Sequence, residues 1–136
     1  MSAYKLRPLA VAVVALAGGA ASCQQSLSSS LLPEGTYALV LVDDSPLPYR
    51  GTSTITLGGA LALQSKGQYS LTQTDSAISG GGGVTQFNSQ GTWTLNENAL
   101  VLRDGGTLYL GVAASLDTLR VNLTVGTVHT NTYVRR

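Results

Sequence analysis

The sequence predicts one all-β domain, an antiparallel up-and-down meander of eight to nine short strands closed into a small barrel. From residue 33 onward, apolar and polar residues alternate with a period of two, and clusters of glycine, proline and asparagine bound the alternating segments. No segment shows a sustained 3.6-residue period or the length of the crossover helix that a parallel sheet needs. A two-sheet sandwich is the alternative arrangement of these strands.

The expected strands share this alternation and cover residues 34–42, 52–57, 60–65, 68–74, 86–95, 99–103, 107–112, 119–125 and 127–135. The first strand places Leu39 and Leu41 on one face. It ends before Pro46-Leu47-Pro48, because two prolines do not fit a central strand. Gly58-Gly59 is expected to turn the second strand into the third, and Lys66-Gly67 turns the third into the fourth.

The later strands follow the same pattern. The fourth alternates Tyr69 and Leu71 with polar residues, and residues 75–83, which include four successive glycines, are expected to form a flexible loop after it. The fifth places Trp93 on the same face as its other apolar residues, so this side chain should point inward. Asp104-Gly105-Gly106 predicts a hairpin turn. In strand 119–125, Arg120 has the parity of the polar residues and should point outward.

Composition and charge exclude several classes of function. Only 11 % of the 136 residues are charged, and the net charge is +1. Without Lys5 and Arg7, which belong to the expected leader, six basic residues face seven acidic ones. This balance produces no field that would attract nucleic acid or an anionic membrane surface, so nucleic-acid binding is not expected. Cys23 is the only cysteine, so the chain forms no internal disulfide.

The first residues have the parts of a secretory signal peptide, expected at residues 1–22. A basic start precedes an apolar run of thirteen residues, from 9 to 21, which is short of the roughly 20 that a spanning helix needs. Ala20-Ala21-Ser22-Cys23 resembles the lipobox of bacterial lipoproteins, and the resemblance implies that Cys23 is lipidated and begins the mature chain. Residues 23–33 then form a lipid-anchored polar tether and residues 34–136 the barrel domain. The expected location is the cell envelope, at the outer membrane or periplasmic face.

The layout of residues 34–136 resembles the bacterial lipocalin-like and META-type small β-barrel lipoproteins. The resemblance rests on Gly35-Thr36-Tyr37, Pro46-Leu47-Pro48, Gly91-Thr92-Trp93 and Tyr133-Val134-Arg135. Glycine, any residue and an aromatic also recur at Gly67-Gln68-Tyr69, and each copy is expected to begin a strand. The resemblance implies a small barrel. Lipocalins begin with Gly-x-Trp, whereas Tyr37 stands at that position here, which weakens the expectation of a large ligand cavity.

The residues that could carry catalysis or bind a metal are few. His129 is the only histidine, and a single histidine in a strand is expected at the surface. No serine lies in a Gly-x-Ser-x-Gly motif, and one histidine without a spare thiolate does not make a zinc site. Asp43-Asp44 is expected to be a solvated turn. No enzymatic activity, metal or cofactor is therefore expected.

Two functions remain open. The first is a structural or protein-interaction module of the cell envelope, with a membrane contact through the lipid anchor and an envelope protein as partner. The alternative is a carrier that binds a small apolar ligand in a lipocalin-like cavity, since a barrel of about eight strands can be filled or can hold one small ligand. The candidate ligand-binding residues are Trp93, Tyr69 and Arg120, the last because arginines in fatty-acid-binding barrels hold a ligand carboxylate.

Overall fold

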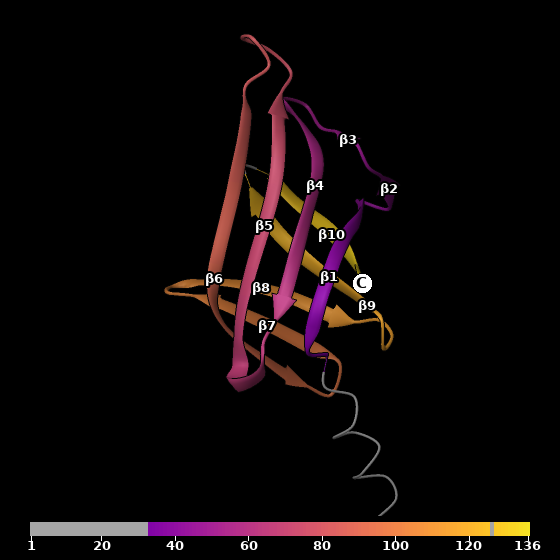
Figure 1. The fold of residues 1–136 in the computed structure, drawn as a ribbon, viewed down its shortest axis with the longest axis vertical. Coiled ribbons are helices and arrows are strands. Elements are labelled where there is room, and N and C mark those ends of the chain that lie inside the picture. The colour runs from indigo at the N-terminus through magenta and orange to yellow at the C-terminus, as the bar shows by residue number, and fades with distance from the viewer. Residues whose placement is uncertain (1–32, 126) are drawn as a thin grey trace, which may run out of the picture. The chain divides into compact units, whose positions relative to one another are not determined.

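The computed structural model describes residues 33–125 and 127–136 (Figure 1). The strands are β1 (Gly35–Val42), β2 (Ser45–Pro46), β3 (Tyr49–Arg50), β4 (Thr54–Leu63), β5 (Gln68–Ala77), β6 (Val84–Asn96), β7 (Ala99–Asp104), β8 (Thr107–Ala113), β9 (Thr118–Val125) and β10 (Thr127–Arg135). A single 3₁₀ turn, η1 (Ser65–Gly67), joins β4 to β5. In the part of the chain that the structure describes, no helix has the length and hydrophobicity needed to cross a membrane.

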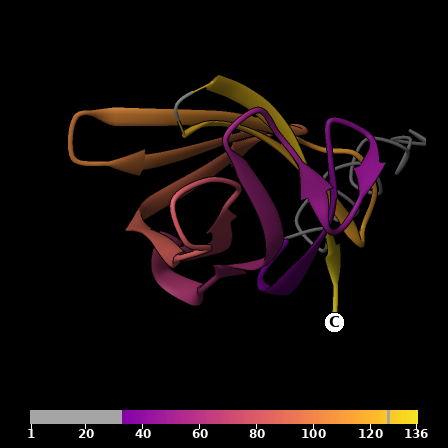
Figure 2. The ribbon, with the colours of Figure 1, turned by 90° about the horizontal axis from the view of Figure 1, so that it is seen from above.

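The strands form one closed antiparallel barrel. Each of β4 to β10 pairs with its neighbour in the chain, and β1 closes the ring by pairing with both β10 and β4. The short strands β2 and β3 lie outside this ring, beside β1 and β4. Figure 2 shows the chain curving round from β4 to β6 and returning through β7 to β10. The predicted antiparallel barrel is therefore confirmed, and the described strands form this one closed sheet instead of the alternative two-sheet sandwich.

Two details of the strand prediction were wrong. Gly58-Gly59 does not turn the chain: β4 runs through it as one strand, with a register shift against β5 between Thr56 and Gly58. Glycine is required at position 59 for space, since a Cβ there would lie 2.6 Å from the backbone oxygen of Thr72. The expected loop at residues 75–83 is shorter, because β5 continues to Ala77 and β6 begins at Val84.

The inside of the barrel is divided along its axis into an apolar and a polar part. The apolar part is filled by fifteen buried side chains: Tyr37, Leu39, Val42, Leu61, Leu63, Tyr69, Leu71, Trp93, Leu100, Leu102, Tyr109, Leu119, Val121, Leu123 and Tyr133. The inward row of β5 shows the division, since it runs from Tyr69 and Leu71 to the buried polar residues Gln73 and Asp75. The hydrophobic core thus gives way to polar side chains along β5, whereas Val42 and Leu123, which pair with Asn131 and His129, keep part of the other end apolar.

Arg135 lies over the aromatic ring that opens β1. Its guanidinium is 5.2 Å from the centre of the Tyr37 ring, and its Nη2 donates a hydrogen bond of 2.9 Å to the Tyr37 hydroxyl. That hydroxyl donates in turn to the carbonyl of Pro33 at 2.5 Å. These contacts join the start of the barrel domain to its last strand, and the cation–π pair contributes about 0.5–1 kcal/mol at this exposed site.

Candidate binding pocket

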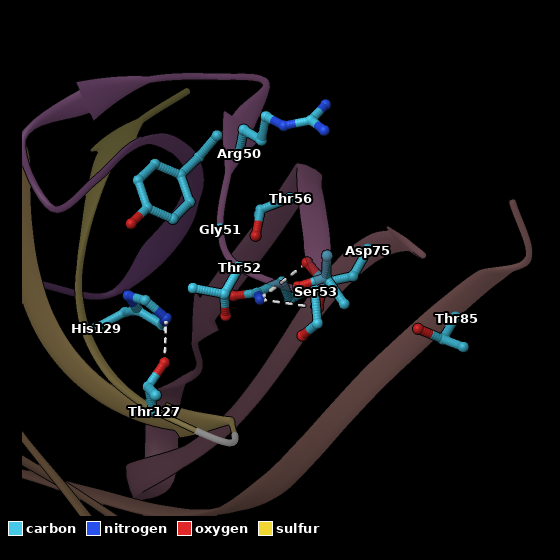
Figure 3. A pocket seen from close by; sticks show the side chains of 12 residues that line it. Arg50, Gly51, Thr52, Ser53, Thr56, Asp75, Thr85, Thr127 and His129 are labelled. Carbon is cyan, nitrogen blue, oxygen red and sulfur yellow. Dashed lines mark hydrogen bonds between the residues drawn. The ribbon is translucent and has the colours of Figure 1, made fainter. Parts of the chain in front are cut away.

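A pocket of about 480 Å³ opens at the polar end of the barrel (Figure 3). Its lining comes from the β3–β4 segment, from inward positions of β4 and β5, and from the starts of β6 and β10. The lining residues are Tyr49, Arg50, Gly51, Thr52, Ser53, Thr54, Thr56, Gln73, Asp75, Thr85, Thr127 and His129. Nine of these twelve residues carry a hydroxyl, amide or carboxyl group, and their apolar atoms line the pocket beside these polar groups.

A chain of three buried polar side chains reaches into the pocket from its floor. Asn131 Nδ2 donates to Gln73 Oε1 at 2.9 Å, and Gln73 Nε2 donates to both carboxyl oxygens of Asp75 at 3.1 Å. The residues are 1 %, 7 % and 6 % exposed respectively. The bonds from Asn131 to Gln73 and from Gln73 to Asp75 both run toward Asp75, so the chain ends in a carboxyl group at the pocket.

The same chain touches the hydrophobic core through Tyr133. Asn131 Nδ2 lies 3.3 Å from the Tyr133 hydroxyl. Burial raises the pKa of Tyr133 to about 12, and the Asn131 hydrogen bond opposes this in part. The hydroxyl therefore stays protonated at physiological pH and belongs to the boundary between the two halves of the barrel.

A second set of contacts holds the β1–β2 turn against β10 at the side of the pocket. Asp43 and Asp44 both have positive φ, 49° and 61°, which is typical of a type I′ hairpin turn. His129 Nδ1 donates to Asp43 Oδ2 at 2.6 Å, and the Thr130 backbone N–H donates to Asp43 Oδ1 at 2.8 Å. Both hydrogen bonds lower the pKa of the Asp43 carboxyl, and the bond from His129 has the larger effect.

His129 is held on three sides. Its Nε2 lies 2.7 Å from the Thr127 hydroxyl, and the Tyr49 ring packs edge-on at 5.6 Å between ring centres. The order carboxyl, imidazole, hydroxyl is that of the triads in which a carboxylate orients a histidine toward a nucleophile. Its effect in this structure is to fix the imidazole ring at the pocket wall.

His129 was predicted at the surface, and the structure places it in the wall of the open pocket with its side chain partly exposed. Its side chain is only 28 % exposed, and it lines the pocket because it shares strand parity with Asn131 and Tyr133, not with Val128. The turn at Asp43-Asp44 was predicted correctly, but Asp43 is bound to His129 and is not simply solvated. Parity with buried residues of the same strand is the signal that sequence reasoning missed, for His129 as for Gln73 and Asp75.

The ligand-binding candidates from the sequence do not gather at this pocket. Trp93 and Tyr69 are buried in the apolar core, where Trp93 Nε1 donates to the Gln64 carbonyl at 2.9 Å and the Tyr69 hydroxyl bonds Ser89 at 2.7 Å. Arg120 points outward, as its parity predicts, and forms an ion pair of 2.7 Å with Asp44. Cys23 lies outside the described residues.

Among residues 33–125 and 127–136, no group of three or more histidine, cysteine, aspartate or glutamate side chains is placed to hold a metal ion. A scan against protein-family models and searches of curated proteins and of solved structures found no match to this chain.

Proposed function

We propose that this chain is an exported, lipid-anchored binding protein of the cell envelope, whose barrel takes a small polar ligand into the pocket at its open end. The observation that carries this proposal is the chain of buried polar groups from Asn131 to Asp75 under a pocket of about 480 Å³. Ligand pockets usually measure 300–1,000 Å³ and fix their ligand through a few convergent polar groups. Buried polar groups are costly unless bonded, so their concentration at one cavity favours a binding role.

The division of the barrel interior supports a polar ligand over an apolar one. A lipid-like ligand would need apolar walls, but the apolar half is occupied by its own side chains, including Trp93 and Leu102 at 7 % and 0 % exposure. The space that remains is bordered by threonine hydroxyls and by Gln73 and Asp75. The apolar-carrier alternative therefore has less support than a carrier or receptor for a polar molecule.

If the barrel has this function, small polar molecules should change the NMR chemical shifts of the pocket-lining residues and of no other residues. The isotope-labelled protein would be titrated with amino acids, polyols, amines and short carboxylates, and amide chemical shifts would be followed by NMR. We expect saturable shifts confined to the pocket-lining residues. Thr85→Trp should abolish them, because it places a large ring at the pocket wall, whereas Thr107→Trp, at an exposed position outside the pocket, should not. Binding of fatty acids with shifts around Trp93 would instead favour the apolar carrier.

The anchor is proposed from the sequence. Small residues precede Cys23, and a polar segment rich in serine and glutamine follows it. Two acyl chains already give stable membrane attachment. We expect Cys23→Ala to abolish incorporation of a radioactive fatty acid and to release the protein from the membrane fraction or leave it unprocessed. Equal labelling of the variant and the wild-type protein would contradict lipidation at this residue and leave export untouched.

A protein-interaction role is the second candidate, favoured by the outer face of β8. Every second residue of this part of β8 presents an apolar side chain to the outside. These residues are Leu108, Leu110 and Val112, which are 50 %, 58 % and 45 % exposed. Exposed apolar residues in a continuous row are typical of contact surfaces between proteins. The Thr85→Trp variant separates the two candidates, since it blocks the pocket and leaves β8 unchanged.

A further inference from the structure

Asp75 is a buried carboxyl group without a cationic partner among the described residues. The ion pairs of this part of the chain join Arg120 to Asp44, His129 to Asp43 and Arg135 to Asp117, and none includes Asp75. Asp75 is nevertheless only 6 % exposed. A charged carboxylate removed from water is strongly disfavoured unless it is paired. A positive group that enters the pocket would supply the missing pair.

The hydrogen bonds around Asp75 leave it free to accept more. A carboxylate has about four acceptor positions. The one side-chain donor bonded to it in the described residues is Gln73 Nε2, shared between the two oxygens at 3.1 Å. Gln73 cannot turn its carbonyl to the ligand without losing the bond from Asn131 at 2.9 Å. The floor of the pocket is therefore fixed with its acceptor end toward the cavity.

The other charged groups of the lining do not cancel this polarity. Arg50 is exposed on the short strand β3, and Figure 3 shows its guanidinium extending away from the pocket. The His129 ring is bound to the Asp43 carboxyl at 2.6 Å, so its Nδ1 already has a partner outside the pocket floor. An anionic ligand would meet Asp75 with a like charge, which disfavours it.

Resting on the proposed function, we propose that the pocket recognises a positively charged organic group, an alkylammonium or a guanidinium, and that Asp75 is its anchor. Such groups donate several N–H bonds and carry no acceptor, so they match a carboxyl group with vacant acceptor positions. Tyr49 also lines the pocket, and aromatic rings attract cations. Gln73 and Asn131 act as positioning residues, because their hydrogen bonds hold the Asp75 carboxyl group in place for the ligand.

The test compares ligands of one shape and different charge on the full chain purified in an uncharged detergent. The probes are n-butylammonium, n-butanol and butyrate, with methylguanidinium as the second cation, and affinity is measured by calorimetry together with NMR mapping. We expect both cations to bind in the pocket and n-butanol and butyrate to bind at least roughly tenfold more weakly, as the loss of a hydrogen bond between charged groups implies. This comparison needs no variant, so it stands even if a substituted protein fails to fold.

Asp75→Asn is the variant that assigns the anchor. Asparagine keeps the shape of the side chain and an oxygen for the Gln73 amide but removes the negative charge. We expect it to weaken n-butylammonium binding at least roughly tenfold. Glu97→Gln is the matched control: it changes the net charge equally, but Glu97 lies in the turn after β6, at the end of that strand opposite to the pocket residue Thr85. This control should bind n-butylammonium as the wild-type protein does.

The possible failures are distinct. Equal affinity for n-butanol, butyrate and n-butylammonium, or unchanged affinity in Asp75→Asn, would overturn the cation assignment. If neutral or anionic molecules nevertheless bind the pocket and Thr85→Trp abolishes this, the proposed function stands without Asp75 as anchor. Binding of Ca²⁺ but of neither organic cation would also overturn the assignment, in favour of an inorganic ion. If no probe and no member of the polar panel shifts the pocket residues, the proposed function fails as well.

Discussion

Replacing Trp93 with alanine is expected to lower the free energy of unfolding by about 3–5 kcal/mol, the cost of emptying a packed aromatic site. The ring is 7 % exposed within the apolar half of the barrel, and its Nε1 is fastened to the Gln64 carbonyl at 2.9 Å. If this half were hollow, part of the ring would already face empty space and its loss would cost less. Urea unfolding followed by far-ultraviolet circular dichroism measures the difference.

Two further variants serve as comparisons for Trp93→Ala. Trp93→Phe keeps most of the buried surface and loses the hydrogen bond to Gln64, so it should be less destabilising than Trp93→Ala. Leu110→Ala removes a side chain that is 58 % exposed on β8 and should change the stability by less than about 0.5 kcal/mol. A Trp93→Ala cost near that of Leu110→Ala would show that the apolar half is not close-packed.

The second large effect is expected at Gly91. A Cβ at this position would lie 1.9 Å from the backbone oxygen of Arg103 and 2.9 Å from its carbonyl carbon, so the neighbouring strand β7 would have to move. Overpacking of this kind costs typically 1–3 kcal/mol, and a backbone obstacle places Gly91→Ala at or above the top of that range. A shift of the midpoint of urea unfolding, or loss of folded protein on expression, measures it.

Gly106→Ala is the control for Gly91→Ala. Nothing lies within 4 Å of a Cβ at Gly106, and its φ is outside the positive range. Alanine there should leave the stability within about 1 kcal/mol of the wild-type value, or raise it by restricting the unfolded chain. Equal effects of the two substitutions would contradict the close approach of β6 and β7 at Gly91.

The class and connectivity of the fold could be predicted because they depend on local patterns. Period-two alternation and hairpin signals such as Asp104-Gly105-Gly106 identify antiparallel neighbours without knowledge of distant contacts. The roles of individual glycines could not be predicted in the same way. Gly59 and Gly91 lie inside strands, where a neighbouring backbone leaves no room for a side chain. The pattern favoured a turn at Gly59. The predicted strand 86–95 did include Gly91, but the Gly-x-aromatic repeat placed a strand start there, and neither pattern showed that glycine is needed for space.

The pocket was missed for a different physical reason. In a sequence, a polar residue that faces the inside of a barrel cannot be distinguished from a polar residue in a loop. Asp75 was therefore assigned to a loop, although it belongs to β5. The pairing of Asn131 with Gln73 joins β10 to β5, strands that are not neighbours in the ring, and only closure of the barrel brings these side chains together. Asp43 and His129 are likewise 86 residues apart. The parity of Gln73 and Asp75 with Leu71 was the one local signal.

The most direct measurement of the proposed binding role is a crystal structure of the protein grown with n-butylammonium. The ligand nitrogen is expected within hydrogen-bond distance of the Asp75 carboxyl oxygens, with Gln73 still bonded to Asn131 and with the Trp93 half of the barrel free of ligand and water. A pocket filled by its own side chains, an Asp75 turned out to bulk solvent, or a ligand bound among the core leucines would contradict a polar pocket above a filled core.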